Sequence, residues 1–105
     1  MVPSIEELRA QCRIDEGDDS DDLLLSAYAA AAVSKAENFL NRTLYEGTVP
    51  ESDPDGLLIE ADIKLALMLV VGHWFENREE TSDAQKVSIP FGFNALLEPY
   101  RFIPL

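Results

Sequence analysis

One apolar segment, Leu57 to Glu80, constrains the fold of this chain more than any other feature. It contains no proline, and its only glycine is Gly72. Its apolar residues recur at helical spacing along two neighbouring stripes: Ile59, Ile63, Ala66, Val70 and Trp74 on one, and Leu58, Ala61, Leu65, Met68, Leu69 and Phe75 on the other. A surface helix has a single apolar stripe about 100° wide. A helix that is apolar around most of its circumference is therefore enclosed by its own domain, or it lends one face to another chain.

Polar residues in and around this segment predict a helix of a soluble domain. A membrane span needs about 20 apolar residues with almost no charge. This run is interrupted by polar residues, namely Glu60, Asp62, Lys64 and His73. The turn residues 54–56 precede the helix, and acids in its first turns suit the positive end of the helix dipole.

Length and charge exclude several classes of function. A chain of 105 residues with an apolar fraction of 47% has room for one folded domain, so residues 1–105 are treated as one domain. The net charge of −12 argues against gripping duplex DNA or an anionic membrane, because both are bound through Lys and Arg. It does not exclude a protein that surrounds DNA without gripping it. Cys12 is the only cysteine, so no internal disulfide forms, and residues 1–7 show no secretion signal.

The first helix is predicted from a capping box. Ser4 and Glu7 are spaced so that the Ser4 hydroxyl accepts from the Glu7 N–H and the Glu7 side chain reaches back to Ser4. The helix runs to about Cys12, with Ile5 and Leu8 on its apolar face. It is too short to be stable alone and must pack on another element.

An acidic run, residues 15–22, follows this helix, and six of its eight residues are acidic. Interpreted as a calcium loop that starts at Asp18, the run places Leu23 where glycine is required and Ala29 where glutamate is required. The spacing therefore favours a structural role, with acids at a helix N-terminus. The residues that suit the N-cap are Asp19 and Ser20.

The second long helix is predicted from Leu23 to about Asn41. Its apolar stripe is rich in alanine and consists of Leu25, Ala29, Ala32, Ala36 and Phe39. Alanine has high helix propensity, and small side chains allow another helix to approach closely. The sequence favours a tight intramolecular pair with the central helix over the alternative, a subunit contact.

The segments beside the long helices are predicted to be irregular or extended. Residues 45–56 are rich in turn-forming residues and form a loop, with a short extended piece around residues 44–49. After the central helix, residues 81–90 are polar and then extended, as in a short strand or an arm.

The C-terminal part combines a short helix with an apolar end. Asn94 is predicted to cap a last helix from Ala95 to about Glu98. Residues 100–105 are mostly apolar, whereas free ends are normally polar. This end either docks on its own core or inserts into a partner.

The sequence predicts no catalytic, metal or cofactor site. His73 is the only histidine, and a zinc helix of the protease type requires a second one. A nucleophilic mechanism needs a Ser or Cys placed beside it, and nothing places Cys12 there. No glycine-rich phosphate loop is present. Trp74 and Phe75 lack the basic neighbours of a base-stacking platform.

Three motifs in order resemble a known family. They are the run RID with the acidic patch and long helix that follow (residues 13–44), HWFENRE (residues 73–79) and PFGFNALLEPYR (residues 90–101). This combination resembles the small head–tail connector, or adaptor, proteins of tailed double-stranded DNA phages. Phe75 stands where the family often has tyrosine, and residues 45–56 align least well.

The resemblance implies an all-α subunit of about four helices, two long and antiparallel and two short, with an extended arm and tail. Copies form a ring of about twelve beneath the portal protein at the capsid vertex. The ring extends the DNA channel and presents a surface for stopper or tail-completion proteins at head completion. The protein would be a structural part of the virion, assembled in the host cytoplasm, with no cofactor and no specific nucleic-acid or membrane binding.

Two sets of candidate residues follow from this comparison and from the residue patterns. Candidates for contact with a neighbouring subunit or the portal lie in the arm and tail: Val87, Ile89, Phe91, Phe93, Tyr100, Phe102, Ile103 and Leu105. Candidates for lining the channel are the acids Asp18, Asp19, Asp21 and Asp22, because an acidic wall repels DNA and lets it slide. These acids can equally face outward.

The sequence is also compatible with other functions. The chain could be a different connector component, such as a stopper, although stoppers tend to be β-rich. From another class, an acidic helical regulator can bind a basic protein without forming a ring. An enzyme is the third alternative. The sequence argues against it, because no set of catalytic partners accompanies His73.

Overall fold

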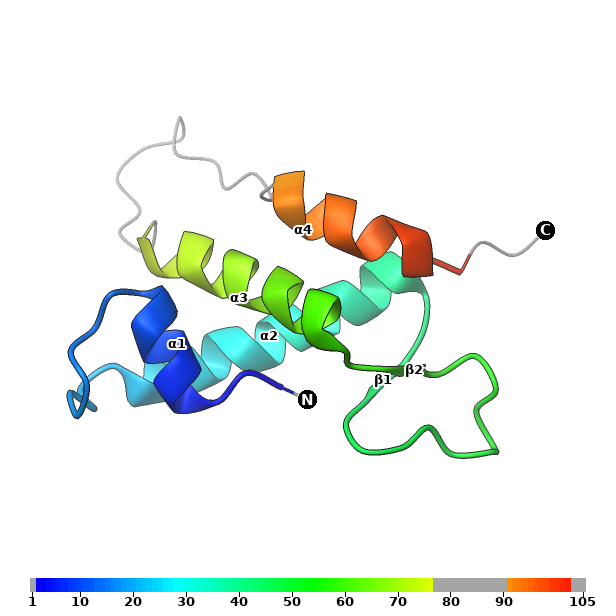
Figure 1. Ribbon diagram of the computed structural model, residues 1–105, viewed down its shortest axis with the longest axis horizontal. Coiled ribbons are helices and arrows are strands. Elements are labelled where there is room, and N and C mark those ends of the chain that lie inside the picture. The colour runs from blue at the N-terminus through cyan, green and yellow to red at the C-terminus, as the bar shows by residue number, and fades with distance from the viewer. Residues whose placement is uncertain (1, 77–90, 103–105) are drawn as a thin grey trace.

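Helix α3 is the element on which the other helices pack. The computed structural model describes residues 2–76 and 91–102 of the chain. In that part the elements are α1 (Ile5–Gln11), α2 (Asp22–Leu40), β1 (Leu44–Tyr45), β2 (Leu57–Leu58), α3 (Ala61–Glu76), α4 (Phe91–Leu97) and a 3-10 turn, η2 (Glu98–Tyr100). The long helices α2 and α3 run antiparallel, α1 packs where α2 begins, and α4 lies along another side of α3 (Figure 1). The predicted all-α fold of two long and two short helices is confirmed.

Helix α1 begins at the predicted capping box. The Glu7 N–H donates to Ser4 Oγ at 3.1 Å, and the Ser4 N–H donates to the Glu7 carboxylate at 2.8 Å. Leu8 is fully buried in the core. This packing supplies the stability that a helix of seven residues lacks by itself.

Helix α2 begins at Asp22, and the prediction that Asp19 or Ser20 is its N-cap is wrong. Asp21 occupies the N-cap position without a side-chain hydrogen bond to the helix. The Ser20 hydroxyl and N–H both donate to Asp18 Oδ1, at 2.8 and 3.1 Å. Asp18 and Ser20 therefore form a separate turn before the helix.

The alanine stripe of α2 serves the intramolecular helix pair. Its buried members are Ala29, Ala32 and Ala36, whereas Ala27, Ala30 and Ala31 face outward. The small buried side chains let α2 lie close against α3, as predicted. The helix ends at Asn41, which adopts the left-handed conformation (φ 59°) that asparagine tolerates, and its N–H donates to the Glu37 carbonyl.

Helix α3 begins at Ala61 rather than Leu57, because the residues before it form an extended bridge. Strand β2 pairs with β1 in parallel. The Leu57 N–H donates to the Thr43 carbonyl at 2.9 Å, and the Ile59 N–H donates to the Tyr45 carbonyl at 3.0 Å. These bonds to a distant segment replace the helical bonds that the local pattern predicted.

Helix α3 is enclosed around most of its circumference. Its buried residues are Ile63, Ala66, Leu67, Val70, Val71, Gly72 and Phe75. Leu67 and Val71 belong to neither predicted stripe, yet they are covered because α1, α2 and α4 all pack on this helix. Leu65, which was assigned to a stripe, is 46% exposed.

Helix α4 begins at Phe91 rather than Ala95, so Asn94 lies within the helix and does not cap it. Phe93 is fully buried, and its ring centroid lies 6.2 Å from that of Phe39 on α2. This aromatic contact fixes α4 against the long helices.

Some predictions are confirmed only in part or fall outside the described residues. The extended piece predicted around residues 44–49 is confirmed for Leu44–Tyr45. The predicted end of the central helix, residues 77–80, and the arm at residues 81–90 lie outside the described residues. Within the described ranges, no helix has the length and apolar character to cross a membrane.

Candidate assembly surfaces

Charged side-chain pairs hold α1, at one end of the molecule, against the start of α2 and against α3. Arg9 on α1 donates twice to Asp22 at the start of α2, from Nε to Oδ1 at 2.9 Å and from Nη2 to Oδ2. Lys64 on α3 forms an ion pair with Glu7 on α1. The hydrogen bond from Arg9 lowers the pKa of Asp22, and the bond from Lys64 lowers the pKa of Glu7.

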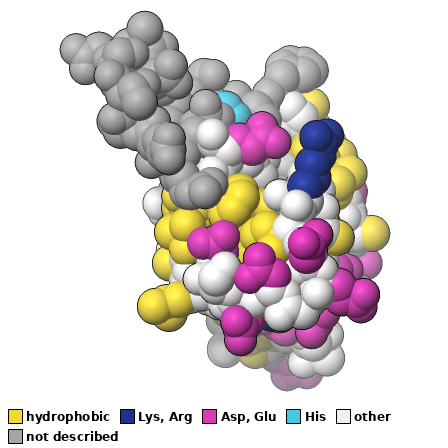
Figure 2. Space-filling view, turned by 90° about the vertical axis from the view of Figure 1, so that its left-hand side faces the viewer, with side chains coloured by type: hydrophobic (Ala, Val, Ile, Leu, Met, Phe, Trp, Pro, Cys, Tyr) yellow, Lys and Arg dark blue, Asp and Glu magenta, His cyan; other side chains and the backbone are white. Residues whose placement is uncertain are grey.

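The four predicted channel-lining acids lie at this end but in different surroundings. Asp22 is held by Arg9. Asp18 and Asp19 are exposed, and Asp21 is half-buried. The bonds from Ser20 lower the pKa of Asp18, because they stabilise its charged form. Figure 2 looks onto this end and shows acidic side chains around an apolar area. Their lining of a channel stays a prediction.

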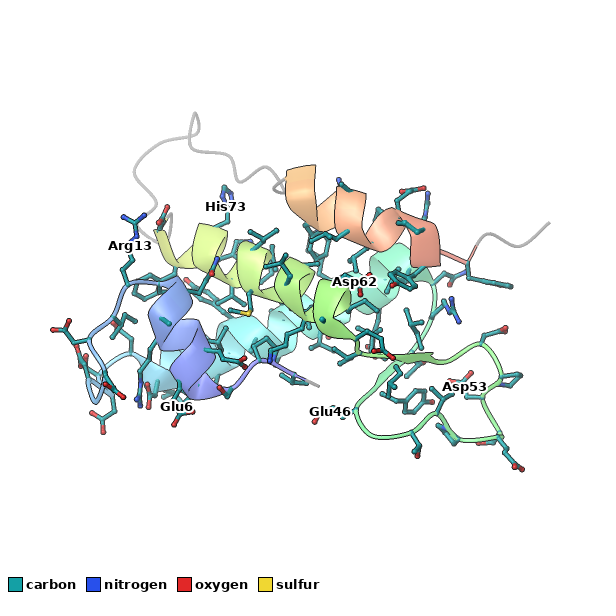
Figure 3. The ribbon with its side chains drawn as sticks, in the orientation of Figure 1. Glu6, Arg13, Glu46, Asp53, Asp62 and His73 are labelled. Carbon is teal, nitrogen blue, oxygen red and sulfur yellow. The ribbon has the colours of Figure 1, made fainter. Side chains whose placement is uncertain are left out.

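Titratable groups of the described residues are spread over the molecule. Figure 3 shows six such residues spread along the molecule: Glu6, Arg13 and His73 towards one end, and Glu46, Asp53 and Asp62 towards the other. Among residues 2–76 and 91–102, no three His, Cys, Asp or Glu side chains are grouped to hold a metal ion. Trp74 is half-buried and packs against the core, with its ring centroid 5.8 Å from that of Tyr28.

Arg42, just after α2, joins two segments at the opposite end of the molecule. Its Nε donates to the Asp55 carbonyl at 2.7 Å, and its Nη2 donates to the Gly56 carbonyl at 3.3 Å. Its Nη1 donates to the Tyr100 carbonyl at 3.0 Å. One guanidinium group thus binds the end of the loop 46–56 and the end of η2.

The chain after α4 is held across the helix ends, and we call residues 98–102 the C-terminal strap. The Tyr100 hydroxyl donates to Asp62 in the first turn of α3, which raises the pKa of Tyr100 because the carboxylate stabilises the protonated hydroxyl. Arg101 Nε donates to the Phe39 carbonyl at 3.2 Å, and its guanidinium lies 5.2 Å from the centroid of the Phe39 ring. The Phe102 N–H donates to the Leu40 carbonyl at 2.8 Å.

The loop 46–56 projects from the body at this same end (Figure 1). The Tyr45 hydroxyl donates to Asp53 Oδ2 at 2.7 Å, which raises the pKa of Tyr45. Figure 3 shows Asp53 inside the loop and Glu46 pointing away from it. Gly56 is buried against the Tyr45 ring, where an added Cβ would lie 2.6 Å from Cε2, so the loop closes only with glycine at this position.

The structure separates the predicted interface residues into four groups. Phe93 belongs to the chain's own core, so its side chain is not available for an interface contact. Tyr100 is half-buried in the C-terminal strap, and Phe102 is 40% exposed at its end. Phe91 begins α4, but its side chain is not among those described. The remaining four lie outside the described residues: Val87, Ile89, Ile103 and Leu105.

Sequence reasoning missed the residues that connect distant segments. Arg42 lies 58 positions from Tyr100, and Arg9 lies 13 positions from Asp22. Neither spacing belongs to a helical or strand repeat, so no local pattern marks these contacts. For Arg42 the acceptors are backbone carbonyls, which every residue carries, and no side-chain type in the sequence points to them.

Comparison with known proteins gives one match. No curated protein and no solved structure matches the chain. The model of the phage gp6-like head–tail connector protein family matches residues 3–101, nearly the whole chain. This match agrees with the three motifs and with the helical fold, and we conclude that the chain belongs to the phage gp6-like head–tail connector protein family.

Proposed function

We propose that this chain is the ring-forming structural subunit of a phage head–tail junction. About twelve copies assemble beneath the portal protein, extend the DNA channel and present a surface for stopper or tail-completion proteins. The observation that carries this proposal is the family match over residues 3–101. The whole chain acts as one connector domain, is assembled in the host cytoplasm and resides in the virion.

The chemical difference between the two ends of the molecule supports a ring whose two faces differ. In a closed ring of identical subunits, neighbours meet through two different lateral surfaces of the same chain, so all copies point the same way. One end carries the acidic turn before α2, and the other carries the loop 46–56 and the C-terminal strap (Figure 1). Such a polarised subunit fits a ring with one face towards the capsid and the other towards the tail.

The exposed apolar end of the C-terminal strap supports contact with the portal. Phe102 keeps 40% of its surface exposed although its backbone is hydrogen-bonded to α2. In the sequence, Phe102 opens the apolar run 102–105, and a cluster of apolar residues at a surface marks an interaction site. The residues that we propose for the subunit or portal interface are Val87, Ile89, Phe91, Tyr100, Phe102, Ile103 and Leu105.

The acidic turn supports a wall that does not bind DNA. Asp18 and Asp19 are exposed, and the chain carries a net charge of −12, so duplex phosphates are repelled. Replacing Asp18, Asp19 and Asp21 with Asn is expected to impair DNA passage during ejection without changing the fold. Unchanged infectivity of phage that carry the triple variant would place these acids outside the channel.

Native mass spectrometry over a range of protein concentrations tests the ring directly. We expect monomers at low concentration and a closed species of about twelve copies at high concentration or on addition of the portal. A chain that stays monomeric in both conditions and does not bind the portal would contradict the proposal. It would favour the acidic regulator instead.

A further inference from the structure

Arg42 makes an unusual set of contacts for an arginine in an acidic protein. Its three hydrogen bonds all go to backbone carbonyls, at 2.7, 3.0 and 3.3 Å. The guanidinium is planar and its donors have fixed directions, so acceptors that bind it together are held in one relative position. Here those acceptors belong to Asp55 and Gly56 on the loop and to Tyr100 on the C-terminal strap.

Each of the two segments is also tied to the body near its contact with Arg42. The loop is closed by the bond from Tyr45 to Asp53 and by the Leu57 N–H, which donates to Thr43. The C-terminal strap is fixed by the Phe102 N–H, which donates to Leu40. The loop and the strap therefore lie at the same end of the molecule (Figure 1).

The surface that these two segments form has a definite chemistry. Residues 43–63 contain six acids and no Lys or Arg. The acidic side chains exposed on the loop are Glu46, Glu51 and Asp55. Phe102, two residues after the Tyr100 carbonyl that shares Arg42 with the Asp55 carbonyl, offers an exposed aromatic side chain. A complementary partner has an apolar pocket for the phenyl ring and Lys or Arg around it.

We propose that Arg42 is a positioning residue that holds the loop 46–56 and the C-terminal strap as one composite docking surface for such a basic-rimmed apolar pocket on a partner protein. This inference rests on the proposed function, in which the partner is the portal. Two binding elements held in a fixed geometry bind more tightly than the same elements with independent motion, because less order is lost on binding. Arg42 thus contributes to affinity without touching the partner.

The composite surface is tested by measuring the affinity of the full chain for the purified portal protein of the same phage. We expect Arg42→Ala to weaken binding about tenfold in the otherwise unchanged chain, because it uncouples the two elements. In the Phe102→Ala background, where one element is already lost, the same change is expected to weaken binding less than about twofold. Arg42→Lys keeps the charge but cannot reach three carbonyls, so it is expected to behave like Arg42→Ala.

Lys35→Ala is the matched control. It removes one positive charge from α2, and Lys35 forms no ion pair within the described residues. Its affinity for the portal is expected to equal that of the unchanged chain. An equal loss from Arg42→Ala in both backgrounds, or full affinity of Arg42→Lys, would overturn the proposal. If the unchanged chain does not bind the portal, the proposed function fails, and the next measurement still decides the role of Arg42.

Amide hydrogen exchange tests the coupling without any partner. In Arg42→Ala the amides of Leu57 and Phe102 are expected to exchange about tenfold faster, although neither amide bonds to Arg42 itself. Amides in the middle of α2 are expected to keep their protection, which shows that the fold persists. Acceleration of only one of the two amides would show that Arg42 does not join the segments.

Discussion

The two ends of this helical bundle are held together by different chemistry. Where α1 meets α2 and α3, the links are pairs of charged side chains, Arg9 with Asp22 and Glu7 with Lys64. Around Arg42, the links are hydrogen bonds from a guanidinium to carbonyls, together with a tyrosine hydroxyl that donates to a carboxylate. The first kind depends on two charges being present, and the second depends mainly on backbone geometry.

This difference gives the two ends opposite responses to pH. At the α1 end the pKa values of Glu7, Asp18 and Asp22 are lowered, so their stabilising contribution is present at neutral pH and is lost as the pH falls through those lowered values. At the Arg42 end the pKa values of Tyr45 and Tyr100 are raised. Their contribution is present below the ordinary tyrosine pKa and is lost as the pH rises through the raised values. Acid therefore loosens one end and alkali the other.

The largest expected effect concerns the core that both ends share. Phe93→Ala is expected to lower the free energy of unfolding by about 3–5 kcal/mol, because Phe93 is fully buried and the change leaves a cavity. Phe102→Ala removes the same side chain from a partly exposed position and is the control. We expect it to cost much less stability. Equal losses in urea unfolding would show that the C-terminal strap is part of the core rather than an interaction surface.

The next effect concerns the Arg42 end. Arg42→Ala is expected to lower the free energy of unfolding by about 1–3 kcal/mol, because partly buried carbonyls lose their donor. Lys35→Ala serves again as the control and is expected to change stability by less than about 0.5 kcal/mol. Thermal unfolding followed by circular dichroism measures both. An Arg42→Ala chain as stable as the control would mean that water replaces the guanidinium without cost.

At the α1 end, Asp22→Asn is expected to lower stability at neutral pH by removing the partner of Arg9. The difference in free energy of unfolding from the unchanged chain is expected to narrow as the pH falls below the ordinary aspartate pKa of about 4, and to close as the pH falls through the lowered pKa of Asp22. Urea unfolding over a pH series measures this difference. Asp19→Asn, in the exposed turn before α2, is expected to have nearly the same stability as the unchanged chain at any pH. A stability difference for Asp22→Asn that persists in acid would show that the ion pair is not its source.

The Arg42 end provides the opposite titration. Tyr100→Phe is expected to destabilise the chain at neutral pH, because the bond to Asp62 is lost. The difference in free energy of unfolding from the unchanged chain is expected to close as the pH rises above about 10 and through the raised pKa of Tyr100. Tyr28→Phe, which removes a hydroxyl elsewhere, is the control and should show no such dependence. If the stability difference between Tyr100→Phe and the unchanged chain stays constant up to alkaline unfolding, the two ends do not respond to pH in opposite directions.

The smallest expected effect concerns the ion pair between Glu7 and Lys64. Glu7→Gln keeps a side chain that completes the capping box, so it removes only the charge. We expect a slight loss of stability at low salt that disappears near 1 M salt, since such partly exposed pairs are screened. The same salt series on Arg42→Ala should leave its loss almost unchanged. If salt reduced the stability loss of both Glu7→Gln and Arg42→Ala, the two ends would not differ in how they depend on charge.

The parts of the fold that were predicted from the sequence depend on local patterns. The capping box at Ser4, the alanine stripe of α2 and the end of that helix near Asn41 involve residues within a few positions of one another. Helix starts were wrong at Leu57 and Ala95, where the outcome depends on distant partners. Leu57 forms a strand because its N–H donates to the Thr43 carbonyl. Helix α4 begins earlier, at Phe91, because Phe93 packs on α2.

The assembly surfaces were predictable only in outline. The apolar end around Phe102 and the acidic run were visible as composition. The sequence contained no sign that Asp22 differs from Asp18 by its bond to Arg9, or that Phe93 is core while Phe102 is exposed. Arg42 carries no motif, because its partners are backbone groups brought together only by the completed fold.

Electron microscopy of the chain mixed with the purified portal ring of the same phage tests the connector function most directly. We expect particles in which an additional closed ring of about twelve subunits sits coaxially beneath the portal. Its attachment is expected to be lost when residues 102–105 are deleted, while circular dichroism shows that the helical content is retained. Portal rings that remain bare at saturating concentrations of the folded chain would contradict the proposed function.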